Sequence, residues 1–209
     1  MPLHPAKAPP EALAAALRGV QRLSSTGNAG DLSGAALAAS SLTVPHQVFV
    51  MRTSDLANGA SIEDQARPFS WRHLVQDSDR QTIASVEVTR DSSSGSFQFA
   101  QFEPGPFAKS TEAEIKTALA LHVVQTGSYE LRLLRIPALY AVALWLKDEG
   151  LGPDLLLPLA PTPLGVEADH VYTADQFLDA LRDLAKRRGS TRPGGDVAGW
   201  STAGSLSGS

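Results

Sequence analysis

The chain has 209 residues, a formal net charge of −4 and a pI near 5.7. It is therefore long enough to bury one substantial core, and its charge argues against nucleic acid as a partner, because binding phosphates needs clustered Lys and Arg. It contains no cysteine, which excludes disulfides, thiolate catalysis and cysteine-ligated zinc.

Neither a membrane segment nor a secretion signal is predicted. The longest apolar run, residues 138–146, is far too short to span a bilayer as a helix. The N-terminus begins with prolines and lacks the charged and apolar regions of a signal peptide. Arginine outnumbers lysine and alanine is abundant, which is typical of GC-rich bacterial genomes. We therefore expect a bacterial cytoplasmic protein with no membrane partner.

Residues 1–45 are predicted to form an N-terminal arm, a helix and a loop. The arm is residues 1–8, and Pro9 can open the helix, since proline is tolerated at a helix start. Leu13 and Leu17 follow at helical spacing. The small, polar residues after this helix predict a loop with one helical turn near residues 33–39.

The next part of the chain predicts strands. The strand patterns cover residues 46–52, 69–76, 82–90 and 96–102. Short polar turns separate the last three, and turns of this length join antiparallel neighbours. Residues 69–103 therefore predict a meander, with Phe69, Trp71, His73 and Val75 on one face of its first strand.

A helix is predicted after the proline-containing break at residues 103–106. Thr111 and Glu114 have the spacing of a capping box, which places the helix start at Thr111. Ile115, Ala118, Leu119 and His122 share its face, and Gly127 is the predicted stop.

Three apolar strands follow, at residues 129–136, 139–147 and 154–161. The middle strand, which contains Trp145, is apolar on both faces. A strand of that kind has to be covered on both sides, so it belongs at the centre of the sheet.

The last predicted helix begins with Thr173, whose capping box is closed by Gln176. Phe177 and Leu181 begin an apolar stripe, which we expect to cover the sheet. Gly189 is the predicted stop.

Together these elements predict an α+β domain with an antiparallel, meander-rich sheet of about six to seven strands and about three main helices. The core domain is expected at residues 46–188. Residues 189–209 are Gly/Ser-rich and are predicted to form a disordered, flexible tail. Trp200 and Leu206 are unusual in such a tail, and we predict them as partner-binding residues of a short docking peptide.

Other candidate residues have structural explanations. Asp77 and Asp79 are acidic neighbours that could hold a cation, but Asp also caps turn amides, and the turn interpretation is favoured. Arg132 and Arg135 are interpreted either as an anion-binding edge or as charges that protect an exposed strand edge. No two histidines have a local metal-binding spacing, so no metal is predicted.

Catalytic and cofactor-binding motifs are missing: the sequence contains no G-x-S-x-G, no S-x-x-K and no glycine-rich phosphate loop. We therefore predict no catalytic residue and no cofactor. The leading hypothesis is a non-catalytic protein-binding domain, adaptor- or chaperone-like, that uses a sheet surface or edge to bind another protein or a second copy of itself. The alternative is a small-molecule binding protein or hydrolase with a pocket between the sheet and the C-terminal helix, using His73, His122, His170 and Tyr140.

Overall fold

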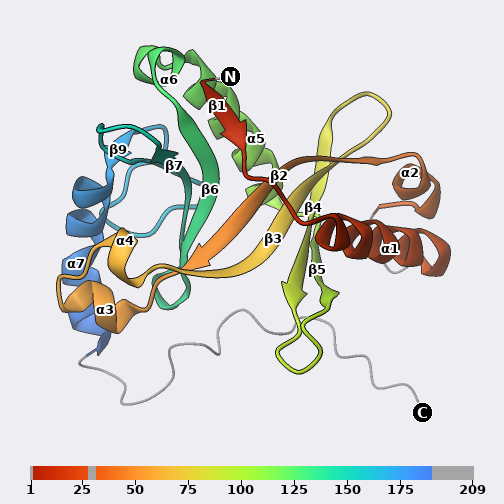
Figure 1. Ribbon diagram of the computed structural model, residues 1–209, viewed down its shortest axis with the longest axis horizontal. Helices are drawn as coiled ribbons and strands as arrows, with labels where there is room; N and C mark the ends of the chain where they lie inside the picture. The colour runs from red at the N-terminus through yellow and green to blue at the C-terminus, as the bar shows by residue number, and fades with distance from the viewer. Residues whose placement is uncertain (1, 28–31, 190–209) are drawn as a thin grey trace.

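A computed structural model describes residues 2–27 and 32–189 (Figure 1). The strands are β1 (Leu3–Pro5), β2 (Ser41–Val50), β3 (Arg67–Gln76), β4 (Thr82–Arg90), β5 (Phe97–Glu103), β6 (Tyr129–Ile136), β7 (Ala141–Asp148), β8 (Leu155–Pro158) and β9 (Tyr172–Thr173). The helices are α1 (Pro10–Thr26), α2 (Gly34–Ala38), α3 (Thr53–Ala57), α4 (Ile62–Gln65), α5 (Pro106–Ala120), α6 (His122–Thr126) and α7 (Ala174–Gly189), with a 3-10 turn η1 (Pro137–Leu139). The architecture is α+β, as predicted.

Within the described residues, all nine strands belong to one mixed sheet in the order β5-β4-β3-β2-β6-β7-β8-β9, and β1 pairs with β6. The predicted meander is confirmed, because β3, β4 and β5 pair antiparallel in sequence order. The sheet has more strands than predicted and is not purely antiparallel, since β6 runs parallel to both β1 and β2. The parallel pairing arises because α5 and α6 carry the chain back to lie beside β2, and parallel neighbours need such a crossover.

The apolar second half forms the centre of the sheet. β6 lies between β2 and β7, and residues 141–146 of β7 are all buried. The strand predicted at 139–147 begins two residues later, because Pro137 opens the turn η1 and Tyr140 has a positive φ of 54°. These residues reverse the chain between β6 and β7.

Helices cover both faces of the sheet. On one face, here called the α5 face, α5 and α6 pack over Val48, Leu133 and Leu144. On the opposite face, here called the α7 face, α3, α4 and α7 pack over Leu134 and Trp145. The helix α1 also lies on the α7 face, at the other side of the molecule in Figure 1. The register shows that α1 and α7 cover the same face. Gln47 of β2 is the register partner of both Trp71 of β3, beneath α1, and Arg132 of β6, on the side of α7, and register partners point to the same face.

The helix α7 matches its prediction. The Thr173 amide donates to Gln176 Oε1 at 3.0 Å, and the Gln176 amide donates to Thr173 Oγ1 at 3.4 Å, which completes the capping box. Phe177 and Leu181 are buried against Trp145 and its neighbours, as the stripe predicted. The described part of the helix extends to Gly189, the predicted stop.

The capping box predicted at Thr111 and Glu114 is wrong. Gly105 is the N-cap of α5, Pro106 is its first residue, and both Thr111 and Glu114 are buried inside the helix. The Thr111 hydroxyl instead donates to the Phe107 carbonyl at 2.6 Å and accepts from Arg72 at 3.0 Å. Proline at the first helical position was therefore the stronger start signal.

The predicted N-terminal segment is integrated into the sheet and its core. Residues 3–5, expected to be a loose arm, form β1 and pair with β6. The helix α1 buries Ala15, Ala16 and Gly19 against the sheet, whereas Leu13 and Leu17 are 40% and 43% exposed. The buried face of α1 thus consists mainly of small residues, which allows the helix to approach β5 closely.

Candidate functional site

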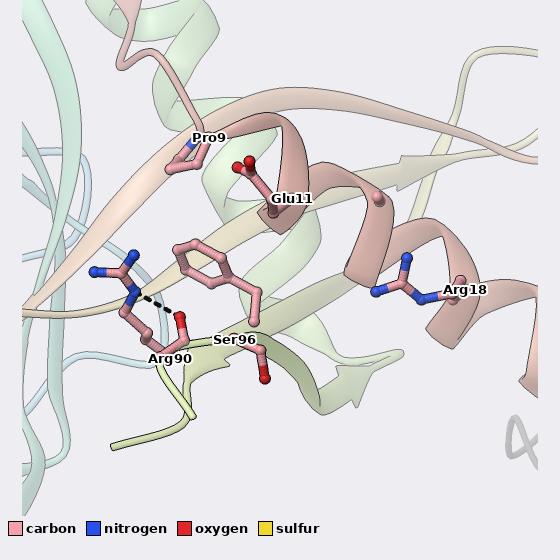
Figure 2. Close-up of a pocket in the computed structure, with 8 residues that line it drawn as sticks. Pro9, Glu11, Arg18, Arg90 and Ser96 are labelled. Carbon is pink, nitrogen blue, oxygen red and sulfur yellow. Dashed lines mark hydrogen bonds between the residues drawn. The ribbon is translucent and has the colours of Figure 1, made fainter. Parts of the chain in front are cut away.

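The described residues form an open groove on the α7 face, between the start of α1 and the hairpin that joins β4 to β5. Two adjoining pockets of about 460 and about 360 Å³ make up this groove and share Pro9, Arg90 and Phe97. We call it the Arg90 groove. Figure 2 shows its first pocket, with Glu11 and Arg18 on α1 across from Arg90 on the hairpin.

The hairpin holds Arg90 in a defined position. Arg90 is the register partner of Phe97, its guanidinium lies 5.5 Å from the centre of the Phe97 ring, and its Nε donates to the Gly95 carbonyl at 2.9 Å. Gly95 has a φ of 70°, which glycine adopts without strain. The cation is therefore fixed over an aromatic ring at the rim of the groove.

Asp91 organises the turn next to Arg90. Its carboxylate accepts hydrogen bonds from the hydroxyls and amides of Ser93 and Ser94. These bonds, with the Ser93 hydroxyl as the largest contributor, lower the pKa of Asp91 to about 2. Asp91 is thus a structural turn residue and keeps the hairpin tip ordered.

The second pocket of the groove is aromatic. It is lined by Phe69, which is 52% exposed, and by Trp71, which is 8% exposed. Phe97 of β5 also lines this pocket and is half-buried. Phe69 and Trp71 lie in the groove because successive side chains of β3 alternate between faces, and both belong to the α7 face.

The groove combines apolar rings with separated charges. Arg18 and Arg90 are exposed cations, and Glu11 is an exposed anion. Aromatic residues and arginine are enriched in the centres of protein interfaces, and arginine binds carboxylates through its planar donors. The arrangement is therefore suited to an apolar side chain with an acidic residue nearby.

A buried ionic cluster lies on the opposite face of the same strands, beneath α5. Arg135 of β6 and Glu87 of β4 form an ion pair at 2.8 Å, and the Ser70 hydroxyl donates to Glu87 at 2.5 Å. Arg72 donates to Thr111 of α5 at 3.0 Å and lies 3.7 Å from Glu103. The cluster connects β3, β4, β5, β6 and α5, so it makes the meander half of the sheet one unit with the central half.

Two buried histidines lie in the meander half of the sheet. Burial, followed by the charge of Arg72, lowers the pKa of His46 to about 3, and burial lowers the pKa of His73 to about 4. The Nδ1 of His46 lies 2.8 Å from the Val44 carbonyl, which makes Nδ1 the protonated nitrogen of the neutral ring. Both imidazoles are therefore neutral at pH 7.

The polar residues of the alternative hypothesis lie on separate elements. His73 is buried in β3, His122 begins α6 and is exposed, and His170 precedes β9 and contacts Tyr172. Tyr140 is 59% exposed beneath Arg188. Among the described residues, no hydrogen bond or ring contact joins any two of these four side chains, and no group of three His, Asp or Glu residues suits a metal. His122 is thus not the core residue that its helical stripe predicted.

The space between the sheet and α7, where the alternative placed its pocket, is occupied by packed side chains such as Phe177 and Leu181. A pocket of about 330 Å³ lies at the N-terminal end of α7 instead, beside Lys147 and Asp154. There Lys147 pairs with Glu63 at 2.5 Å and with Asp154 at 3.3 Å. These charges compensate one another, which is typical of a structural site.

The arginines of β6 do not lie at an edge, so both sequence interpretations of them are wrong. Arg135 is in the buried cluster, and Arg132 stacks 4.9 Å from the ring centres of both Phe49 and Trp145. The turn interpretation of Asp77 is confirmed, since its carboxylate accepts from the amides of Asp79 and Gln81 at 3.0 and 2.8 Å. The predicted partner-binding residues Trp200 and Leu206 lie outside the described residues.

Sequence reasoning missed both the groove and the cluster. The aromatic alternation in β3 and β5 was visible, but nothing in it distinguished a buried face from a groove floor. The polar residues of the meander, including Arg72 and Glu87, looked solvent-facing because their cover, α5, comes later in the chain.

Within residues 2–27 and 32–189, no helix combines the length and apolar character that a bilayer span requires. Comparison of the chain with protein-family models, with curated proteins and with solved structures finds no match.

Proposed function

We propose that this chain is a non-catalytic protein-binding domain of the bacterial cytoplasm, adaptor- or chaperone-like, that holds a peptide segment of its partner in the Arg90 groove. The supporting observation is the composition of the groove. Phe69, Trp71 and Phe97 offer apolar surface, and Arg90 is already fixed above one of the rings. A rigid aromatic and arginine surface loses little conformational entropy when a ligand binds.

The surroundings of the groove support the same proposal. The ionic cluster on the other face ties β3 and β4 to β6 and α5, which makes the floor of the groove rigid. The groove is open, and Phe97 of the edge strand β5 lines it. An extended peptide with one apolar anchor and a carboxylate fits these features better than a small enclosed molecule does.

The test is a selection of displayed peptides on the immobilised full chain, followed by affinity measurements on the selected peptides. Phe69→Ala and Arg90→Gln should each weaken binding at least about tenfold, since aromatic and arginine side chains dominate such contacts. Leu164→Ala is the matched control, because Leu164 is 80% exposed and does not line the groove. Its affinity should equal that of the unmodified chain.

Two results would contradict the proposal. One is that no peptide is enriched on the folded chain. The other is that the selected peptides bind the Phe69, Arg90 and Leu164 variants equally, which would place the binding surface outside the groove.

A further inference from the structure

We infer that the Arg90 groove, in the absence of a partner, is occupied by the C-terminal segment of the same chain, with Trp200 as the anchoring side chain. The inference rests on the proposed function, because it names an internal competitor for the same peptide-binding surface. It also gives residues 190–209, with their single tryptophan, a defined binding site.

The helix α7 ends at the same end of the sheet as the groove. Arg188 in its last turn donates to the Ala138 carbonyl at 2.6 Å, which places this turn beside η1, at the end of β6. Arg135 near the end of β6 is the register partner of Val50, and Val50 is the partner of Arg67 at the start of β3.

The groove begins with the next residues of β3, Pro68 and Phe69. Ser70 is the register partner of Thr89, so Arg90, the next residue of β4, belongs to this same end. The helix α7 also covers the face of the sheet on which the groove opens. The C-terminal segment therefore leaves the domain on the correct face and at the correct end to enter the groove.

The segment is long enough to reach the groove. From β6 to β4 the chain must cross three strand spacings, about 15 Å at about 4.8 Å each. With a height of about 10 Å for a helix above a sheet, the path is roughly 20 Å, which about six extended residues span. Ten residues lie between Gly189 and Trp200, so the segment reaches the groove with residues to spare.

The chemistry of the segment complements the groove. Trp200 supplies a large aromatic surface for Phe69 and Phe97, and its ring can also stack on the Arg90 guanidinium. Residues 190–209 carry one cation, Arg192, and one anion, Asp196, which lies four residues before Trp200. Arg18 and Arg90 outnumber Glu11 in the groove, so the anion enters a surface with an excess of positive charge.

Docking within one molecule is favoured over docking between copies. The ten residues 190–199 hold Trp200 near the groove at an effective concentration in the millimolar range, far above ordinary protein concentrations. A contact with one main anchor is weak, and it is populated only at such a concentration. A partner peptide must therefore displace the segment, which makes the segment autoinhibitory.

The experiment compares amide NMR spectra of the full chain and of the full-length Trp200→Ala variant. We expect the amide signals of Phe69, Arg90 and Phe97 to differ between the two proteins, and the differences to persist after tenfold dilution. The variant Leu206→Ala should change the groove signals less, because it retains the anchor. Phe69→Ala should in turn shift the indole N–H signal of Trp200.

Affinity for a selected peptide gives the second readout. Trp200→Ala should bind the peptide about tenfold more tightly than the unmodified chain, because the competitor is removed. Unchanged groove signals together with unchanged affinity would overturn the inference and leave the proposed function standing. Groove signals that change on dilution would also overturn it, since the segment would then come from a second copy.

Failure of the proposed function has a different signature. In that case no peptide is selected on either protein, while the spectra still show Trp200 in the groove. The docking of the segment would then be a structural contact and not the inhibition of a binding site.

Discussion

More charged residues are buried in the interior than the sequence pattern predicted. Arg72 is 1% exposed, and Glu87 and Arg135 are each 5% exposed. Burial, followed by the charge of Arg135, lowers the pKa of Arg72 to about 10, which still leaves it protonated at neutral pH. Charges at this depth are tolerated because each has a partner of opposite sign. Removing one partner destabilises the protein by more than the intact pair stabilises it.

The ion pair of Glu87 and Arg135 can be tested by removing its acidic member. Glu87→Ala should lower the free energy of unfolding by about 3–5 kcal/mol, because the buried Arg135 loses its compensating carboxylate. Glu130→Ala is the control, since its ion pair with Arg132 is partly exposed and should contribute under about 1 kcal/mol. Urea denaturation measures both, and equal losses would show that the cluster is not buried.

Burial at the centre of the sheet leads to a second prediction. Trp145 is 2% exposed, packs edge-on to Phe49 with ring centres 5.0 Å apart, and donates from Nε1 to Asp154 at 2.8 Å. Trp145→Ala should therefore cost about 3–5 kcal/mol of stability. Asp79→Ala should cost under about 1 kcal/mol, because the turn is held by the carboxylate of Asp77. If equilibrium denaturation gives similar losses for the two variants, the central position of β7 is wrong.

Among the elements, α1 packs closely on the sheet through a single small residue, Gly19. A Cβ atom at Gly19 would lie 2.0 Å from Cδ2 of Phe99 in β5. Glycine in a helix interior usually costs stability relative to alanine, by about 1 kcal/mol. Here only glycine allows α1 to approach the edge strand β5 so closely. This packing also forms one wall of the Arg90 groove.

Gly19→Ala should thus destabilise the protein by about 1–3 kcal/mol, despite the higher helix propensity of alanine, because the added methyl group displaces Phe99. The control is Leu17→Ala on the exposed side of α1, which should cost under about 1 kcal/mol. Thermal unfolding of both variants decides the matter. A stabilised Gly19→Ala protein would mean that α1 and β5 are not in close contact.

For the whole molecule, the neutral buried histidines connect stability to pH. The folded-state pKa values of His46 and His73 are about 3 and about 4, below the ordinary value of 6.5. Their contribution to stability is complete above pH 6.5 and is lost as the pH falls, because the unfolded chain then takes up protons that the folded chain does not bind. The arginine beside His46 adds to this preference for the neutral ring.

Between pH 6.5 and pH 5, the free energy of unfolding should fall by up to about 1.4 kcal/mol per pH unit for each histidine. His73→Leu should reduce the slope by about half, since one titrating group is removed. His122→Leu is the control and should keep the full slope, because His122 is exposed. Urea denaturation at several pH values measures the slopes, and a flat profile in the unmodified chain would show that both rings are accessible to protons.

The sequence by itself determined the elements whose signals are local. The strand at Tyr129–Ile136 and the helix after Thr173 follow from short-range alternation, capping and helical periodicity, and so does the meander of β3, β4 and β5. The central position of β7 also followed, since a strand that is apolar on both faces has to be covered on both sides.

Apart from the cover by α7, which its apolar stripe predicted, the tertiary structure alone decided what covers each face. The crossover through α5 put β6 parallel to β2 and turned Arg72 and Glu87 into interior residues. The packing of α1 on β4 and β5 buried its alanine and glycine face and left Leu13 and Leu17 exposed. The Arg90 groove exists because α1, β3 and β5 meet there. Their contacts join residues far apart in the chain, and burial depends on those contacts and not on the residues nearby in sequence.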